Sequence, residues 1–286
     1  MKQPTEAAGW LLAALPLIVS CNGQAVRDAP PSEAAASVPV AAAADLRTLR
    51  PVDLTYTFDE STLYWPTSPT RFELEELADG PTEAGFYYSS YSLRTPEHGG
   101  THLDAPVHFG EGMLSVDRVP LERLIVPAVV IDVSQQAAAD PDYRLTVADV
   151  EAWEGEHGSV PEGAAVLLRT GWGRHWPDPV RYLGDDRPGD ASSLHFPSFG
   201  EEAVRYLIEE RGVVVLGVDT ASIDHGPSTD FPVHRVSAAA NVCGLENLAN
   251  LDQLPATGAW LIALPMKIGG GSGAPLRAVA LVPPGG

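Results

Sequence analysis

The residues of this sequence that could do chemistry are concentrated in one short stretch. Three histidines and an aspartate fall within eleven consecutive positions: His98, His102, Asp104 and His108. Imidazole and carboxylate together suit Zn²⁺ or Mn²⁺, whereas ligand sets made only of oxygen suit Mg²⁺ or Ca²⁺. Isolated histidines usually lie on the surface or form hydrogen bonds in the core. Three histidines within eleven positions are too closely clustered for that to be the expected explanation. We therefore expect a transition-metal site here.

The spacing of these residues can be tested against backbone geometry. In an extended segment His102 and Asp104 project to the same side, about 6.6 Å apart, so their side chains can converge on one ion. His98 would lie roughly 13 Å from His102 in that geometry, which is too far for a shared ligand. The chain must therefore bend, and Gly99-Gly100 permits a bend. The alternative is a helix that places His98 and His102 one turn apart, but the glycines disfavour it.

The elements that must position this stretch alternate between strands and helices. Thr146 and Asp149 are spaced as a capping box for a helix that runs through Trp153. Residues 201–210 have the apolar spacing of a second helix. Five short apolar runs predict buried strands, namely 128–133, 165–169, 213–218, 260–264 and 278–282. Alternating strands and helices predict an α/β domain.

Length and charge narrow the function classes. At 286 residues the chain can hold one large domain or two small ones. Hydrophobic residues make up 44% and charged residues 20%, as in a soluble globular enzyme. The formal net charge of −20 argues against a nucleic-acid partner, because binding a phosphate backbone requires a basic surface.

The N-terminus is typical of a bacterial lipoprotein signal. The apolar run 9–19 has the length of a signal-peptide core, and it is shorter than the about 20 residues that span a bilayer. Ile18-Val19-Ser20-Cys21 resembles a lipobox, in which the thiol of Cys21 takes the lipid. An ordinary secretory signal or an untrimmed N-terminus is the alternative. Cys243 is then unpaired, and no intrachain disulfide is expected.

The domain organisation follows from these features. We expect a signal peptide at 1–20, a lipid-anchored disordered tether at 21–47 and a folded domain at 48–286. The tether is rich in Ala and Pro and lacks a hydrophobic period, so it cannot bury enough apolar surface to order itself. Asn22 is not the aspartate that retains lipoproteins at the inner membrane. We therefore expect the protein in the cell envelope, anchored to the outer membrane and facing the periplasm.

The stretch that begins at His98 resembles the H-x-G-T-H-x-D-x-P-x-H-F signature of the cyclase family of metal-dependent hydrolases. That family includes kynurenine formamidase and isatin hydrolase. The resemblance implies that His98, His102 and Asp104 bind a first metal ion and that Asp104 bridges to a second. It also implies that His108 is the catalytic acid/base. An imidazole with its ordinary pKa near 6.5 can do this at neutral pH.

A second ligand element of the family is a histidine followed twelve residues later by a glutamate. His234 and Glu246 fit this spacing, and the resemblance implies that both bind metal. Gly99 stands where relatives often have threonine, a change that affects no ligand. Cys243 lies close to Glu246, and we expect it to pack in the core. Further similar stretches extend the match from about Val52 to Ala280.

The resemblance also implies a fold and a reaction. The fold would be a single α/β domain with mixed sheets, in the swivelling β/β/α arrangement, and relatives assemble as homodimers or homotetramers. The reaction would be hydrolysis of N-formyl-L-kynurenine or a related aryl amide by water activated at one or two Zn²⁺ or Mn²⁺ ions, with His108 moving the proton. An isatin-type lactam is the alternative substrate. Trp65, Phe86 and Trp172 are candidates for stacking on an aromatic small molecule.

The remaining polar residues have weaker signals. Asp219 and Asp224 are expected to cap or accept hydrogen bonds in turns, although they could be extra ligands. His175 and His195 are expected to pack or to line a pocket. The glycine-rich stretch 269–273 lacks the Gly-Lys-Ser/Thr ending of a phosphate-binding loop, so we expect a mobile loop.

Two hypotheses from other functional classes stay open. One is a catalytically idle lipoprotein that binds metal for capture, and the presence of His108 argues against it, because this residue binds no metal in the family pattern. The other is a surface interaction module whose histidines are structural. Metal analysis of the purified protein separates the second hypothesis from the rest, since a structural module would carry no transition metal.

Overall fold

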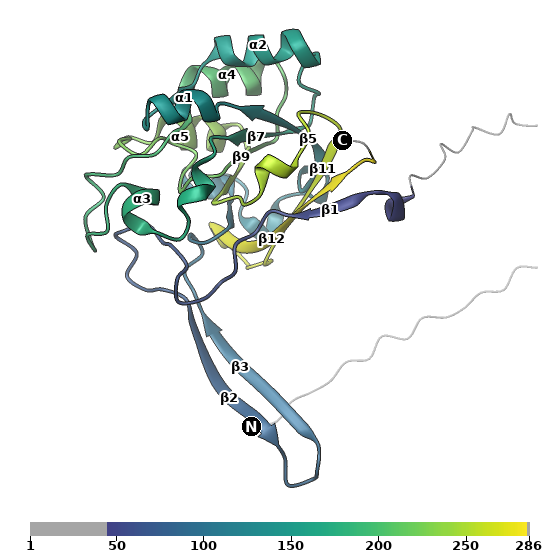
Figure 1. The fold of residues 1–286 in the computed structure, drawn as a ribbon, viewed down its shortest axis with the longest axis vertical. Helices are drawn as coiled ribbons and strands as arrows, with labels where there is room; N and C mark the ends of the chain where they lie inside the picture. The colour runs from purple at the N-terminus through teal and green to yellow at the C-terminus, as the bar shows by residue number, and fades with distance from the viewer. Residues whose placement is uncertain (1–44, 285–286) are drawn as a thin grey trace, which may run out of the picture. The chain divides into compact units, whose positions relative to one another are not determined.

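The computed structural model describes residues 45–284, and Figure 1 shows their arrangement. The predicted signal peptide, Cys21 and the tether up to residue 44 lie outside the described residues. The strands are β1 (Arg50–Asp53), β2 (Glu73–Pro81), β3 (Tyr87–Arg94), β4 (His102–Asp104), β5 (Ile125–Asp132), β6 (Arg144–Leu145), β7 (Ala165–Arg169), β8 (Ser198–Phe199), β9 (Val215–Val218), β10 (Cys243–Glu246), β11 (Ala259–Pro265) and β12 (Gly273–Val282). The helices are α1 (Ser134–Ala139), α2 (Val147–His157), α3 (Pro179–Leu183), α4 (Glu201–Glu209) and α5 (Pro232–Ala239). Within 45–284, no helix has the length and apolar character needed to cross a bilayer.

The elements predicted from local patterns are present. The five predicted strands correspond to β5, β7, β9, β11 and β12, with ends that differ by a few residues. The predicted capping box begins α2: the backbone amide of Thr146 donates to Asp149 at 2.8 Å, and the amide of Asp149 donates back to the Thr146 hydroxyl. The run 201–210 forms α4. The prediction of a single α/β domain with mixed sheets is confirmed.

The main sheet closes on itself, which the sequence patterns did not show. Its eight strands run in the order β1-β12-β11-β5-β7-β9-β10-β4, and β12 also pairs with β4 through residues 273–275. Strands β5, β7, β9 and β10 are mutually parallel, whereas β4, β11, β12 and β1 join by antiparallel pairs. The result is a mixed barrel in which β4 and β10 lie side by side.

Alternation along the strands separates the barrel core from the functional residues. Successive side chains of a strand point to opposite faces. Leu103 of β4 and Leu245 of β10 pack in the core cluster that fills the barrel, together with small residues such as Ala263 and Ala278. His102 and Asp104 flank Leu103 and therefore point to the outside of the barrel wall. A second core cluster joins the outer face of β5, β7 and β9 to α2, α4 and α5, the layer of helices visible in Figure 1.

Candidate metal centre

The predicted bend lies at the glycine pair before β4. Gly99 has φ of 146° and Gly100 has φ of 55°, a region that favours glycine. Both positions are also too crowded for a side chain. A Cβ atom on Gly99 would lie 2.0 Å from the Tyr64 ring, and one on Gly100 would lie 2.6 Å from the Phe58 ring. The bend turns His98 back toward β4, where its Nδ1 lies 2.6 Å from Oδ1 of Asp104, the last residue of that strand.

Strand pairing brings the fourth member of the cluster to this place. In the antiparallel pair of β4 and β10, Glu246 is directly opposite His102. The imidazole of His102 is oriented by the carbonyl of Gly100, which lies 3.0 Å from its Nδ1. Its Nε2 consequently faces the carboxylates, 3.2 Å from Asp104 Oδ1 and 3.4 Å from Glu246 Oε2.

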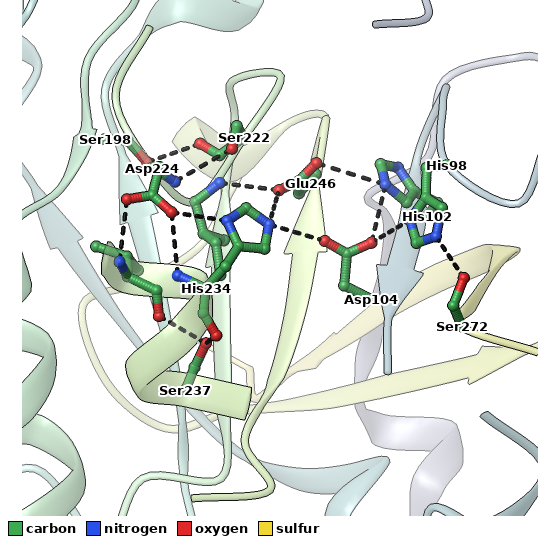
Figure 2. Close-up of polar contacts among 12 residues, drawn as sticks. His98, His102, Asp104, Ser198, Ser222, Asp224, His234, Ser237, Glu246 and Ser272 are labelled. Carbon is green, nitrogen blue, oxygen red and sulfur yellow. Dashed lines mark hydrogen bonds and ion pairs between the residues drawn. The ribbon is translucent and has the colours of Figure 1, made fainter. Parts of the chain in front are cut away.

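Helix α5 supplies His234 from the other side of the cluster (Figure 2). Asp224 holds the start of this helix, because its carboxylate accepts hydrogen bonds from the backbone amides of Val233 and His234, both at 3.0 Å. The same carboxylate lies 2.7 Å from His234 Nδ1. His234 Nε2 is thereby turned toward Asp104 Oδ2 and Glu246 Oε1, each at 3.2 Å. Asp224 therefore does more than cap a turn, since it orients a candidate ligand.

The two carboxylates each face both sides of the cluster. Asp104 turns one oxygen toward His98 and His102 and the other toward His234. Glu246 likewise turns one oxygen toward His102 and the other toward His234. Figure 2 shows the carboxylates between the histidines. The five predicted ligands therefore converge, although they come from the bend, β4, α5 and β10.

The donor atoms of this cluster fit a cation. His102 Nε2 is buried and makes no aligned hydrogen bond, although two carboxylate oxygens lie within 3.4 Å of it. Burial opposes a charge on this ring, but Asp104 and Glu246 outweigh burial and raise the pKa of His102 to about 9. Without a cation, a proton must therefore balance these carboxylates. A divalent transition metal would supply that charge and take imidazole and carboxylate as ligands.

The pKa shifts of the neighbouring groups have the same origin. Burial works against the charged form of Asp104, yet the adjacent histidines hold the pKa of its carboxyl well below its usual range. Burial also disfavours a charge on His234, yet Asp104, Asp224 and Glu246 raise the pKa of His234 well above its ordinary value. Buried charges persist only when they are paired or coordinate metal. The cluster is thus a set of buried, mutually paired charges, and its imidazoles and carboxylates are groups that a metal ion can take as ligands.

His108 lies at the edge of the cluster. Pro106 begins the short turn that follows β4, and His108 ends it. The His108 ring stacks on the His98 ring, with 3.8 Å between centroids and 18° between planes. Part of the ring is exposed through the cavity mouth, but many atoms surround the rest. This burial, with the nearby histidines, lowers the pKa of His108 to about 4, and the expectation of an ordinary value near 6.5 is corrected.

His108 is also close enough to be a ligand by distance. Its ring nitrogen, one of His98 and an oxygen of Asp104 lie within 4.8 Å of one another, as do donor atoms of His102, Asp104 and Glu246. Geometry alone therefore allows His108 either beside the metal or on it. A variant at this position distinguishes the two roles.

A cavity of about 270 Å³ opens over the cluster. Three aromatic side chains line it, Trp65, Phe109 and Phe231. The Phe231 ring centroid lies 6.2 Å from that of Trp65 and 5.3 Å from that of Phe109. The other lining residues are members of the cluster, apolar residues and a few polar ones: Leu63, Tyr64, His98, Gly99, His102, Asp104, His108, Leu183, Ala221, Ser222, His234, Glu246 and Asn247. The arrangement can hold a flat apolar group against the candidate metal centre.

The predicted stacking residues separate into two groups. Trp65 lines the cavity. Trp172 does not, because it is buried in a separate core cluster and its indole donates a hydrogen bond to the Tyr182 carbonyl. Phe86 does not either, because it lies at the turn between β2 and β3, where its side chain is 59% exposed. Phe109 and Phe231 are the aromatic residues found at the cavity instead.

Three further residues considered from the sequence, Asp219, Cys243 and His195, lie outside the cavity lining. Asp219 accepts hydrogen bonds from the hydroxyl and amide of Thr170 and from the amide of Gly171, so it organises a turn as expected. Cys243 is fully buried in the barrel core, and burial raises the pKa of its thiol to about 12. His195 does not line the cavity, and its ring is paired with Asp142 at 2.8 Å.

Asn247 at the cavity was not identified from the sequence. Its side-chain amide donates a hydrogen bond to the Gly100 carbonyl at 2.8 Å, so it supports the bend before β4. Asn247 adopts a positive φ of 54°, which asparagine tolerates better than most residues. Its position directly after Glu246 was a signal that could have identified it.

Ser272 is the second residue that sequence reasoning missed. Its hydroxyl lies 2.9 Å from His98 Nε2 and 2.6 Å from Glu97 Oε2. The flanking glycines allow this approach, because a Cβ atom on Gly271 would lie 2.7 Å from Glu97 and one on Gly273 would lie 2.6 Å from the His98 ring. The glycine-rich stretch therefore belongs to the site, where we expected only a mobile loop.

Replacing Ser272 with alanine should weaken metal binding without unfolding the domain. The hydroxyl orients His98 from outside the cluster, and loss of such a contact typically costs about 10–100-fold in metal affinity. Competition with a chromophoric chelator measures this affinity, and Ser192→Ala at an exposed loop position is the matched control. Equal affinities for Ser272→Ala, the control and the unmodified chain would contradict the orienting role.

Comparison with known proteins gives a consistent set of relatives. A family model described as putative cyclase matches residues 52–225. The chain is 37% identical to the isatin hydrolase of Roseibium aggregatum over 223 residues, which cover 74% of this chain and 82% of that protein. It is 34% identical to the kynurenine formamidase of Salinibacter ruber over 195 residues, which cover 66% of this chain and 77% of that protein.

The similarity extends to solved structures. The structure of isatin hydrolase A from Labrenzia aggregata bound to benzyl benzoate aligns with a TM-score of 0.76 and 39% identity, covering 82% of this chain and 94% of that one. An isatin hydrolase bound to the product analogue thioisatinate aligns with a TM-score of 0.75 and 34% identity, covering 83% of this chain and 94% of that one.

Proposed function

The chain belongs to the cyclase family, and on that premise we propose that it is a metal-dependent hydrolase that cleaves the C–N bond of an aryl amide. One observation carries the proposal: His98, His102, Asp104, His234 and Glu246 converge at the base of an aromatic-lined cavity, with His108 beside them. Clusters of perturbed titratable groups in a cavity are typical of catalytic sites.

We propose that these five residues hold one or two ions of Zn²⁺ or Mn²⁺. His98 and His102 would share an ion with one oxygen of Asp104, while His234 and Glu246 face the other oxygen. This division of the Asp104 oxygens between the two sides of the cluster supports two ions, which the five residues would hold together. A bound metal of this kind lowers the pKa of water from 15.7 toward about 7 and polarises a carbonyl.

The residues around the metal centre would transfer the proton, bind the aryl ring and hold the ligands in place. His108 is neutral at pH 7, because its pKa is lowered, so it can accept the proton of the attacking water. The imidazolium formed in this way can then protonate the leaving nitrogen. Trp65, Phe109 and Phe231 would hold the aryl ring, and Asp224 keeps the His234 ring in place.

Within the aryl amides, the leading hypothesis is an arylformamidase-like activity on N-formyl-L-kynurenine or a related compound. A lactam of the isatin type is the second candidate, and one observation favours it. Among residues 45–284, those that line the cavity include no lysine or arginine, so a substrate carboxylate distant from the scissile bond would find no basic partner among them. Isatin is flat and uncharged and has no such group.

A panel of substrates tests the proposal. The purified full-length chain, loaded with Zn²⁺ or Mn²⁺, is assayed with N-formyl-L-kynurenine, formanilide, isatin and a lactone. We expect turnover of at least one aryl amide or lactam at about 1 s⁻¹ or faster, lost on chelation and restored by metal. Bound metal without turnover of any member would instead support the idle metal-binding lipoprotein. Absence of bound metal would support the structural module.

We also propose that the chain is a lipoprotein of the bacterial outer membrane, facing the periplasm. The support is the lipobox-like sequence that ends at Cys21 and the tether that follows it. In a bacterial host the protein should sediment with membranes, and Cys21→Ala should release it or block its processing. Equal membrane association of Cys21→Ala and the unmodified chain would show that Cys21 does not anchor the protein.

A further inference from the structure

The hydroxyl of Tyr182 lies in the interior of the domain, and the proposed mechanism gives it no part. Tyr182 belongs to α3, and its side chain is 0% exposed within the core cluster that contains Trp172 and Phe196. Its hydroxyl lies 3.0 Å from Asn247 Oδ1 and 3.1 Å from the backbone oxygen of Asp219. Phenylalanine would fill the same space without the free-energy cost of burying a hydroxyl. The hydroxyl therefore indicates a polar function at this position.

Asn247 connects this hydroxyl to the bend before β4. Its side-chain nitrogen donates a hydrogen bond to the Gly100 carbonyl at 2.8 Å. Because a carbonyl oxygen can only accept, Nδ2 must face Gly100, and Oδ1 then faces Tyr182. Burial raises the pKa of Tyr182 well above its ordinary value, so the hydroxyl keeps its proton and can donate it to Oδ1. The hydroxyl thus favours the one orientation of the amide that suits the Gly100 carbonyl.

The backbone of Asn247 is held on both sides. Its amide donates a hydrogen bond to the Thr220 carbonyl at 2.8 Å, and its carbonyl accepts one from the Thr101 hydroxyl at 2.6 Å. Asn247 also follows Glu246 directly, at the end of β10. The side chain of Asn247 therefore projects from a fixed point beside two candidate ligands.

The Gly100 carbonyl is the point at which these contacts reach the candidate metal centre. Besides the bond from Asn247, it faces His102 Nδ1 at 3.0 Å, and a carbonyl oxygen has two lone pairs for two donors. A donor bond from Nδ1 leaves Nε2 as the nitrogen that faces Asp104 and Glu246. Such a contact to the remote nitrogen of a ligating histidine fixes its tautomer and the orientation of its ring.

We propose that Tyr182 and Asn247 are positioning residues that hold His102 as a metal ligand by fixing the Gly100 carbonyl. We call Tyr182, Asn247 and this carbonyl the relay. The inference rests on the proposed metal centre but on neither the substrate nor turnover. Both polar atoms of the Asn247 side chain are engaged in the relay, and Tyr182 lies outside the cavity lining. The two residues therefore act on the ion only through His102.

Competition of the full-length chain with a chromophoric chelator for Zn²⁺ tests the relay. Tyr182→Phe removes one oxygen atom and keeps the ring, and we expect the affinity for Zn²⁺ to fall about 10-fold. Asn247→Gly tolerates the positive φ of 54° and should lower the affinity about 10–100-fold. Tyr143→Phe is the matched control, because its hydroxyl bonds Asp149 at the start of α2, and it should keep the unmodified affinity.

The double variant separates the relay from general loosening of the core. If the hydroxyl acts through Asn247, Tyr182→Phe should cost no further affinity once Asn247→Gly is present. Independent effects would instead multiply, to a loss of about 100–1,000-fold. A second readout is the Nδ1 proton of His102 in the Zn²⁺-loaded protein, followed by NMR with isotope-labelled histidine. This proton should exchange with water faster in Tyr182→Phe than in Tyr143→Phe, because its acceptor is less firmly held.

Equal affinities and equal exchange rates for Tyr182→Phe and Tyr143→Phe would overturn the relay and leave the proposed hydrolase untouched. A multiplied loss in the double variant would also overturn it and assign Tyr182 to packing alone. If Asn247→Gly does not fold, the exchange rate in Tyr182→Phe decides. A chain with no affinity for Zn²⁺ would overturn the metal centre and the relay together. A chain that binds Zn²⁺ without hydrolysing any substrate would contradict the proposed function only.

Discussion

Replacing His102 or Asp104 with alanine should abolish metal binding and hydrolysis together. These two side chains project from the same side of β4 and lie at the centre of the cluster, where every other candidate ligand approaches one of them. If either side chain is removed, the remaining carboxylate and imidazoles no longer provide enough ligands around one position to hold an ion. Turnover should fall to the background of the reaction without enzyme, because no other group can activate the water.

The stability readout separates lost ligation from lost folding. Metal that binds only the folded state at 100 times its Kd adds about 2.7 kcal/mol to the free energy of unfolding. In a domain of this size that corresponds to a rise in Tm of roughly 5–10 °C. The unmodified chain should show this rise on adding Zn²⁺ or Mn²⁺, and His102→Ala and Asp104→Ala should not. For each variant the Tm is measured with and without metal, and the two values are subtracted. Any effect of the substitution on the Tm of the metal-free protein therefore cancels.

His195→Ala is the matched control for these variants, because His195 is exposed, paired with Asp142 and absent from the cavity lining. It should bind metal and shift its Tm as the unmodified chain does. Full metal occupancy in both His102→Ala and Asp104→Ala would show that the ion binds elsewhere. Glu246→Ala should lose about half of the metal if two ions share Asp104, and all or none of it if a single ion binds.

Replacing His108 with alanine should leave metal content near that of the unmodified chain and reduce turnover by roughly 10²–10⁴-fold. His108 lies beside the five proposed ligands and is not one of them. Its neutral ring is therefore the nearest side chain that is free to act as a base. Metal content is measured by elemental analysis and turnover under saturating substrate. Added imidazole should restore part of the activity, because the cavity left by the ring opens to solvent.

His108→Phe distinguishes proton transfer from packing. Phenylalanine can preserve the stacking on His98, which alanine removes, but it cannot accept a proton. If His108 is the acid/base, both variants lose turnover. If its ring only supports His98, His108→Phe recovers activity and His108→Ala loses metal affinity. Outright loss of metal from both variants would make His108 a ligand, and full activity in both would remove it from the mechanism.

The lowered pKa of His108 gives this prediction a pH dependence. An imidazole with a pKa near 6.5 would lose its base form as the pH falls through the neutral range. The pKa of about 4 keeps His108 neutral to lower pH, and a bound cation would favour the neutral form further. The acidic limb that His108 sets should therefore lie below about pH 5, and any fall in the neutral range should come from the metal-bound water, whose pKa is about 7. A fall centred near pH 6.5 that persists in His108→Ala would belong to another group.

The features that could be predicted from the sequence are those that residues close together in the chain determine. The ligand types, the shared side of His102 and Asp104 and the bend at Gly99-Gly100 all follow from backbone geometry over a few residues. The capping box of α2 is local in the same way. His234 and Glu246 were assigned by their spacing in a known signature, and no local rule could have placed them near His98.

Tertiary structure decided which distant residues share the site. Strand pairing sets Glu246 opposite His102, α5 turns His234 toward Asp104, and the contact of β12 with β4 brings Ser272 to His98. The same long-range packing placed Trp172 in a core cluster away from the cavity, whereas Phe86 lies at the exposed turn between β2 and β3. Long-range packing also surrounds His108 closely enough to lower its pKa. The sequence by itself determined the chemistry of the ligands, because side-chain type and short spacing are local properties. Their assembly into one centre required the closed barrel, whose pairings join segments far apart in the chain.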